Sequence, residues 1–167
     1  MNNYVLIGFM GCGKTTIGKV LSGKTSWANP DTDALLVEEA GRPVTEIFAK
    51  EGEQGFRDRE TNLLKRLVAD GLENRIYSTG GGIVLREENR ELLQQLGTVV
   101  YLEISPEEVL RRLGDDTTRP LLQGENRMEK VRELLDYRRG IYESCADWTI
   151  PVDGRTPEEI AGEILKL

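Results

Sequence analysis

The sequence contains no histidine among its 167 residues, and this absence excludes several kinds of active site. A Ser-His-Asp or Cys-His nucleophile, a histidine-ligated zinc site and an imidazole acid–base group all need that side chain. Only two cysteines occur, Cys12 and Cys145, too far apart in sequence for a zinc-binding spacing or a disulfide framework. Any proton transfer must therefore use a carboxylate, lysine, tyrosine, cysteine or the substrate itself.

Long apolar runs and a basic excess are also missing. No stretch approaches the length of a membrane span, and the first residues lack the basic region and apolar run of a signal peptide. With 22 Lys and Arg against 29 Asp and Glu, the net charge of −7 disfavours nucleic acid or an anionic membrane as a partner. We expect a cytoplasmic protein, and a monomer because no apolar stripe demands a partner.

Short apolar runs alternate with helical patterns along the chain. Strands are expected at residues 4–8, 75–79, 98–104 and 147–152, and the rhythm places one more near 25–30. Helices are expected at 14–23, 53–69, 87–96 and 126–146, and after the caps Ser105 and Thr156, each followed by proline and glutamates. The pattern predicts a single α/β domain over residues 1–167, with three layers (α/β/α) around a central five-stranded parallel sheet.

One motif carries a specific chemistry. Residues 8–15 read GFMGCGKT and match G-x-x-x-x-G-K-[ST] directly after a strand and at the start of a helix, as in P-loop NTPases. Glycines let backbone amides turn toward phosphate oxygens, Lys14 reaches the β- and γ-phosphates, and Thr15 offers its hydroxyl to magnesium. We expect this segment to bind ATP with Mg²⁺ through Gly11, Cys12, Gly13, Lys14, Thr15 and Thr16.

A phosphate-binding loop alone does not distinguish a kinase from a GTPase or a mechanical ATPase. The strand expected at 75–79 ends in Gly80, Gly81 and Gly82, which suit either close approach of a ligand or a flexible turn. Asp31 and Asp33 follow the expected second strand. Such carboxylates cap a helix, or they hold hydrated magnesium and orient an acceptor hydroxyl in a kinase.

Two further pairs stand at helical spacing, Arg57 with Glu60 and Arg138 with Tyr142. Each pair alone is most often a solvated surface pair. Two planar guanidinium groups that converge on a carboxylate would instead form a bidentate clamp, which lysine could not reproduce.

Seven arginines fall between positions 111 and 139 of this acidic chain. They fit either solvated helix faces or a site for small anions. The long polar segment at about 115–126 in the same region is typical of a lid or binding loop.

Together these motifs resemble the shikimate kinase family of small P-loop kinases over essentially the whole chain. The resemblance rests on residues 8–15, 31–33, 56–60 (FRDRE), 80–82, 118–122 (TRPLL), and Arg138 with Tyr142. It implies transfer of the ATP γ-phosphoryl group to the 3-hydroxyl of shikimate, with ATP/ADP and shikimate as the small-molecule partners. A mobile lid at about 115–126 and an acceptor-binding region at about 31–60 are implied as well.

The resemblance also implies a role for each matched residue. Lys14, Asp33 and Arg119 would be catalytic, with Asp33 on the shikimate hydroxyls and Arg119 on the transferring phosphate. Asp31 would join Thr15 at magnesium, and Arg112 and Arg155 would pack against adenine. The expected shikimate site comprises Asp33, Arg57, Glu60, Gly80, Gly81, Gly82 and Arg138.

Three features depart from the family pattern. Asn29 stands where an aromatic residue is usual, Gly140 replaces a proline, and the segment before Asp31 is unusual for a strand. Two alternatives stay open: a kinase of another small polyhydroxy acid such as gluconate, and a nucleotide-binding module without turnover. The second predicts loss of Lys14, Thr15, Asp33 or Arg119, and all four are present.

Overall fold

A parallel sheet forms the centre of the computed structural model, which describes residues 2–114 and 126–167. Its strands are β1 (Asn3–Ile7), β2 (Arg75–Ser78), β3 (Thr98–Glu103) and β4 (Trp148–Pro151), in the order β2-β1-β3-β4. Leu6 pairs with Ser78 on one side and with Val100 on the other. Val5, Leu6 and Ile7 are all fully buried, as both faces of a parallel sheet require.

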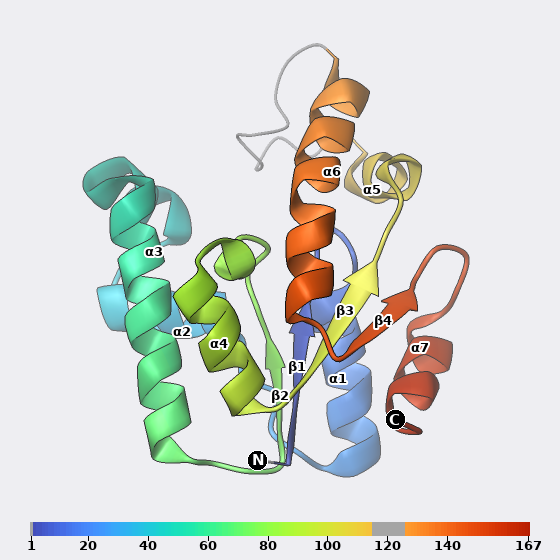
Figure 1. The fold of residues 1–167 in the computed structure, drawn as a ribbon, viewed down its shortest axis with the longest axis horizontal. Helices are drawn as coiled ribbons and strands as arrows, with labels where there is room; N and C mark the ends of the chain where they lie inside the picture. The colour runs from blue at the N-terminus through green and yellow to red at the C-terminus, as the bar shows by residue number, and fades with distance from the viewer. Residues whose placement is uncertain (1, 115–125) are drawn as a thin grey trace.

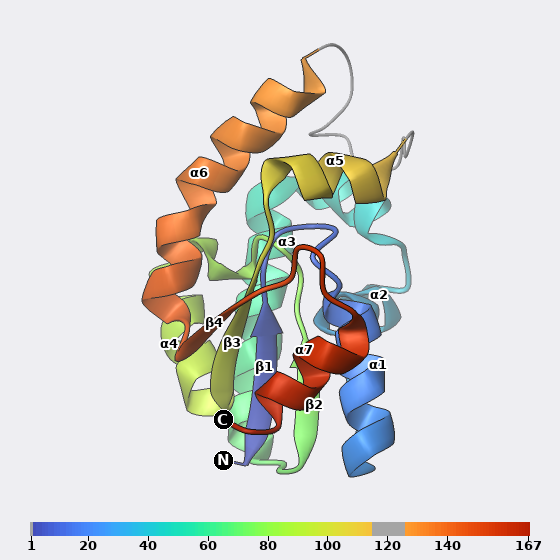
Figure 2. The same cartoon turned by 90° about the vertical axis from the view of Figure 1, so that its right-hand side faces the viewer.

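Helices cover both faces of this sheet, which confirms an α/β fold (Figure 1). Helices α1 (Lys14–Thr25) and α7 (Pro157–Ile164) lie on one face, and α4 (Glu87–Leu96) and α6 (Arg127–Cys145) lie on the other (Figure 2). Helix α5 (Pro106–Leu113) lies above the carboxyl ends of the strands (Figure 2). Within the described residues, no helix is long and apolar enough to cross a membrane.

Both predicted caps are confirmed. Ser105 Oγ accepts the amide of Glu108 at 3.2 Å, and Thr156 Oγ1 accepts the amide of Glu159 at 3.2 Å. Each satisfies an amide that the first helical turn leaves without a partner. Helices α5 and α7 therefore begin where the sequence predicts.

The prediction of five strands is wrong for the described residues, which form a four-stranded sheet. The segment expected as a strand makes only two isolated bridges, Ala28 with Arg75 and Asp31 with Ser78. Pro30 has no amide proton to give, and the Asn29 side chain donates to the Ile76 carbonyl at 2.6 Å. This segment lies alongside β2 but does not form a regular ladder of hydrogen bonds with it.

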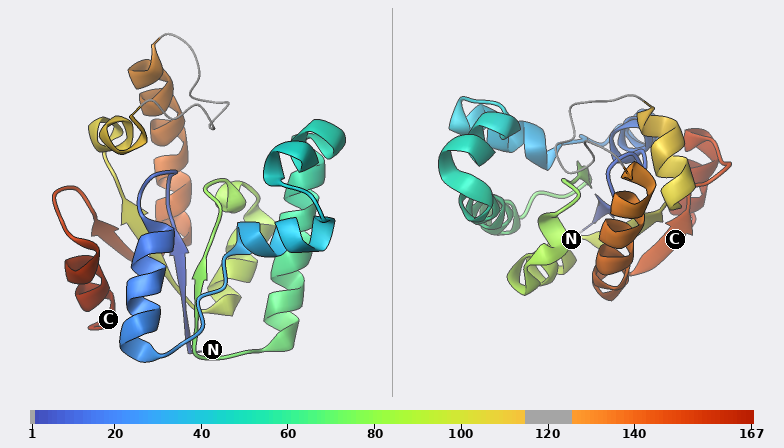
Figure 3. Two further views of the ribbon diagram at one scale, coloured as in Figure 1. Left: turned by 180° about the vertical axis from the view of Figure 1, so that it is seen from behind. Right: turned by 90° about the horizontal axis from the view of Figure 1, so that it is seen from above.

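Two helices pack on each other beside the sheet, α2 (Thr32–Ala40) and α3 (Val44–Asp70) (Figure 3). Their apolar side chains form a second, smaller core of Leu36, Ile47, Phe56 and Leu63. Helix α3 is interrupted at Gly52, with φ 74° and ψ 177°, so only its second part matches the predicted helix at 53–69. Helix α2 was not predicted as a helix.

The predicted lid at 115–126 lies outside the described residues, except for Asn126.

Candidate active site

The loop between β1 and α1 has the backbone of an anion-binding site. Gly8, Gly11 and Gly13 have φ values of 153°, 81° and 96°, and a Cβ on Gly8 would lie 2.8 Å from the Leu102 carbonyl oxygen. Helix α1 begins at Lys14, and no side chain caps its first turn. The amides of this turn, which includes Thr15 and Thr16, therefore suit an anionic ligand.

The Lys14 ammonium group folds back over the same loop. It donates to the carbonyl oxygens of Gly8 at 2.6 Å and Phe9 at 3.2 Å, and it lies 3.6 Å from Cys12 Sγ. Cys12, itself a residue of the loop, is fully buried. The positive charge of Lys14 thus lies at the loop that supplies the amides.

A small cavity of about 120 Å³ adjoins the loop. Arg112 from α5 and Arg155 from the segment before α7 line it, together with Cys12 and Gly13 of the loop and Thr16 of α1. Arg112 Nη1 donates to the Gly11 carbonyl oxygen at 3.0 Å. The structure thus brings together these predicted nucleotide-binding residues from three separate parts of the chain.

Arg57 and Glu60 form a buried ion pair on α3. Arg57 Nη1 donates to Glu60 Oε1 at 2.7 Å, and Glu60 is fully buried. Burial raises the pKa of Glu60 to about 7, although the Arg57 charge opposes this shift. The pair is therefore not a solvated surface pair, and it orients the Arg57 guanidinium.

Arg57 reaches the glycine segment that follows β2. A Cβ on Gly82 would lie 2.3 Å from Arg57 Nη2, so only glycine leaves room for this guanidinium. Phe56 lies beneath it, with its ring centroid 5.3 Å from Arg57 Cζ.

Arg138 reaches the same segment from α6. Its Nη1 atom would lie 3.6 Å from a Cβ on Gly81, and its Cζ lies 5.9 Å from the centre of the Phe9 ring. Tyr142, one turn further along α6, donates to the Gly81 carbonyl oxygen at 2.6 Å. Helix α6 runs unbroken through Gly140, where the family's proline is absent.

The two aspartates lie at the start of α2. Asp31 caps that helix, because its Oδ1 accepts the amide of Ala34 at 3.1 Å. The Asp33 carboxylate lies against Gly80, where an added Cβ would come within 2.7 Å of Oδ1. Between them Thr32 is buried, and its hydroxyl accepts the Gly80 amide at 3.3 Å. Asp31 is thus a cap, as one interpretation of the sequence held, while Asp33 faces the glycine segment.

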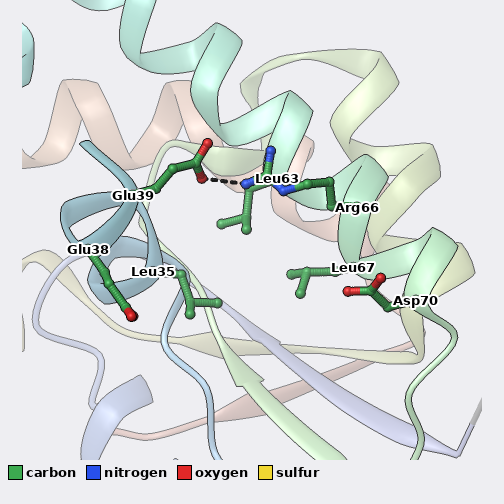
Figure 4. Close-up of a pocket in the computed structure, with 7 residues that line it drawn as sticks. All are labelled: Leu35, Glu38, Glu39, Leu63, Arg66, Leu67 and Asp70. Atoms are coloured by element: carbon green, nitrogen blue, oxygen red, sulfur yellow. Dashed lines mark hydrogen bonds and ion pairs between the residues drawn. The ribbon is translucent and has the colours of Figure 1, made fainter. Parts of the chain in front are cut away.

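A larger cavity of about 460 Å³ lies elsewhere, between α2 and α3 (Figure 4). Leu35, Leu63 and Leu67 line it, and Glu39 forms an ion pair with Arg66 at its edge (Figure 4). None of the predicted site residues lines this cavity.

Sequence reasoning missed several residues that build the site. Phe9 occupies a variable position of the loop motif, and Thr32 stands between two more conspicuous aspartates. Glu108 bonds Arg112, and only its spacing of four residues on a helix could have indicated the contact. Arg119, predicted to be catalytic, lies outside the described residues.

Comparison with known proteins identifies the family. The model of the family described as shikimate kinase matches residues 10–167. This chain belongs to the shikimate kinase family. A shikimate kinase of Enterococcus faecalis is 45% identical, with 99% of this chain and 98% of that protein covered. One of Thermodesulfovibrio yellowstonii is 42% identical, with 99% and 94% covered. The chain is therefore an ATP-dependent kinase.

Solved structures agree with this assignment. A shikimate kinase from Acinetobacter baumannii in complex with shikimate has a TM-score of 0.91 at 39% identity, covering 99% of this chain and 92% of that one. A gluconokinase from Sinorhizobium meliloti has a TM-score of 0.61 at 17% identity, which shows a shared fold alone.

Proposed function

We propose that this chain transfers the γ-phosphoryl group of ATP to the 3-hydroxyl of shikimate, releasing ADP and shikimate 3-phosphate. The observation that carries the proposal is the meeting of two buried arginines, Arg57 and Arg138, at the adjacent glycines Gly82 and Gly81. Two guanidinium groups held there suit a carboxylate such as that of shikimate.

Each acceptor-side residue then has a task. Arg57 and Arg138 bind the substrate carboxylate, Glu60 holds Arg57 in orientation, and the backbone of residues 80–82 lies close to the ring. Asp33, which faces the same glycine segment, binds and orients the hydroxyl that attacks phosphorus.

On the nucleotide side, the amides of Gly11, Cys12, Gly13, Lys14, Thr15 and Thr16 bind the phosphates. Lys14 exchanges its contacts with the loop carbonyls for phosphate oxygens and, with Arg119, counters the charge that develops during transfer. Arg112 and Arg155 hold the adenine in the cavity that they line.

The residues at the loop fit a magnesium ion that is bound mainly through ATP. Within residues 2–114 and 126–167, no three acidic, cysteine or histidine side chains gather to hold a metal ion. Thr15 and Asp31 offer the one or two oxygen ligands that Mg²⁺ takes when phosphates and water supply the rest. Asp31 bridges to Ser78, whose hydroxyl donates to the Lys14 carbonyl at 3.2 Å, so Asp31 lies near the first turn of α1. When bound, the metal ion would neutralise phosphate charge.

We further propose that residues 1–167 act as one kinase domain in a cytoplasmic monomer, with a lid at about 115–126. Nucleic acid and membranes are not proposed as partners, in keeping with the net charge of −7.

The test is an ATP-consumption assay with shikimate, gluconate and nucleoside monophosphates as separate acceptors. We expect turnover with shikimate alone, and loss of turnover in Lys14→Met. A chain that consumes ATP with gluconate but not with shikimate would contradict the proposed acceptor. A chain that binds ATP but uses no acceptor would indicate a module without turnover.

A further inference from the structure

Arg112 is held at two points, although it stands on the surface of α5. Its Nε donates to Glu108 Oε1 at 2.8 Å, and its Nη1 donates to the Gly11 carbonyl oxygen at 3.0 Å. All donors of a guanidinium group lie in its plane, so two bonds from different nitrogens fix that plane. The flat faces form no hydrogen bonds, and Arg112 lines the cavity beside the phosphate-binding loop.

Glu108 is itself firmly held. Its side chain is 13% exposed, and Arg111 binds it from the solvent side through Nε at 2.9 Å and Nη2 at 2.5 Å. Hydrogen bonds from Arg111, and then from Arg112, lower the pKa of Glu108 to about 2. The carboxylate is therefore ionised at neutral pH.

The wall of the cavity that Arg155 forms is built in the same way. Arg155 Nη1 donates to the Pro151 carbonyl oxygen at 3.1 Å, and its Nη2 pairs with Glu163 at 2.5 Å. Asp153, two residues before Arg155, accepts the amide of Ser105 at 3.1 Å and so ties this wall to the start of α5. Both arginines are thus oriented before any ligand arrives.

We propose that Glu108 is a positioning residue for the nucleotide, which acts through Arg112 and does not touch the nucleotide itself. It holds the guanidinium so that one flat face meets a planar base in the cavity. Without Glu108, Arg112 must be immobilised when the nucleotide binds, and that cost weakens binding. The inference rests on the proposed function only in placing the base of ATP or ADP in this cavity.

The negative charge of Glu108 allows a clear test. Its removal should strengthen nucleotide binding if the charge acts only by electrostatics, and weaken binding if Glu108 positions Arg112. Removal of a negative charge near bound phosphates favours an anionic nucleotide by simple electrostatics. Loss of positioning weakens binding instead. Glu107 provides the matched control, since it stands on the same first turn and pairs with Arg132 at 2.7 Å. A change at Glu107 alters the same charge without contact to Arg112.

The experiment measures ADP affinity by titration calorimetry for Glu108→Gln and Glu107→Gln. We expect Glu108→Gln to raise the Kd for ADP about three- to tenfold, and Glu107→Gln to leave it unchanged or slightly lower. In an Arg112→Ala background, Glu108→Gln should have no further effect. The KM for ATP should rise with the Kd while the KM for shikimate stays constant. Equal effects at both glutamates, or effects of Glu108→Gln and Arg112→Ala that add, would overturn the proposal.

Two further measurements keep the result interpretable. If Glu108→Gln unfolds, Glu108→Asp keeps the charge but is too short to hold Arg112, and we expect the same rise in Kd. Unchanged ADP affinity in a folded Glu108→Asp protein would then overturn the proposal. A wild-type chain that binds ADP but does not phosphorylate shikimate would contradict the proposed function alone, since the ADP titrations still test Glu108. A wild-type chain that does not bind ADP would overturn both.

Discussion

The hydroxyl of Tyr142 donates a hydrogen bond of 2.6 Å to the carbonyl oxygen of Gly81, and this bond joins α6 to the glycine segment after β2. Burial raises the pKa of this tyrosine to about 12, so the hydroxyl keeps its proton at neutral pH. Because Arg138 lies one turn earlier on α6, the same bond holds the part of the helix that carries Arg138 next to Gly81.

Replacing Tyr142 by phenylalanine should therefore weaken the acceptor site. The part-buried Gly81 carbonyl loses its partner, which costs about 1–2 kcal/mol of unfolding free energy. We expect the KM for shikimate to rise and the KM for ATP to stay constant in steady-state kinetics. Tyr137→Phe on the same helix is the control, because Tyr137 is 69% exposed. A higher KM for ATP alone would contradict this role.

Gly82→Ala should damage the site without unfolding the protein. The new methyl group would overlap Arg57 Nη2, at 2.3 Å, and the side chain would have to leave. Binding of shikimate should fall by at least tenfold, because one of two arginines is lost from the clamp. Gly162→Ala on α7 meets no atom within 4 Å and serves as the control, with unchanged kinetics. Calorimetric titration with shikimate measures the effect, and unchanged affinity would show that Arg57 does not bind the substrate.

Arg57→Lys tests the geometry of the clamp rather than its charge. Lysine keeps the positive charge but lacks the planar fork, so shikimate binding should weaken by about 2 kcal/mol. An acceptor analogue without the carboxylate should be indifferent to the change. Arg59→Lys alters a pair with Glu51 on the same helix and should leave the KM for shikimate unchanged. Equal affinity of wild type and Arg57→Lys for shikimate would refute the bidentate contact.

Glu60 should make stability depend on pH. Burial raises its pKa from 4.5 to about 7, so the folded state binds a proton more tightly than the unfolded state does. The stabilisation from that proton is complete below pH 4.5 and is lost as the pH rises through 7. Relative to Glu60→Gln, the wild type should thus lose up to about 3 kcal/mol over this range.

Urea denaturation of wild type and Glu60→Gln from pH 4.5 to 8 measures this difference. Glu53→Gln is the control, since Glu53 also faces Arg57 but its side chain is 59% exposed. A difference in unfolding free energy that is constant over the range would contradict the raised pKa.

Arg119→Ala tests a role that only the sequence predicts. Loss of a cation that contacts the transferring phosphate should lower kcat by about two to four orders of magnitude, with little loss of shikimate binding. Stopped assays with saturating ATP and shikimate measure kcat, and near-normal turnover would refute the role.

Local signals predicted much of the fold. Strands such as residues 98–103 are largely continuous apolar runs. The caps Ser105 and Thr156 mark where helices α5 and α7 begin. The apolar residues of α2, residues 34–37, are consecutive and do not recur at helical spacing, and the helix follows a segment whose composition is unusual for a strand. The sequence marks the segment before Asp31 as unusual for a strand, but the bonds that this segment forms with β2 are contacts between distant parts of the chain, which a local pattern does not specify.

The residues of the candidate site also differ in how far the sequence predicts them. The phosphate-binding loop is continuous in sequence, so its spacing alone indicated the chemistry. The proposed clamp joins α3, α6 and the glycine segment. Helical spacing alone left each arginine pair as either a surface pair or part of a clamp, and the family resemblance favoured the clamp. Contacts made through space, such as Tyr142 with Gly81 or Arg112 with Gly11, required the folded chain.

The irregular segment beside β2 has a consequence for association between molecules. An open sheet edge offers free amides and carbonyls to any extended peptide, and such edges promote aggregation. Here the Ile76 amide donates to the Ala28 carbonyl, the Ser78 amide donates to the Pro30 carbonyl, and the Ile76 carbonyl accepts from Asn29. Pro30 has no amide proton to give to the Ile76 carbonyl, and the Asn29 side chain donates to that carbonyl in its place. The segment that leaves the sheet one strand short thereby occupies the groups at Ile76 and Ser78 that an extended peptide would otherwise pair with on β2.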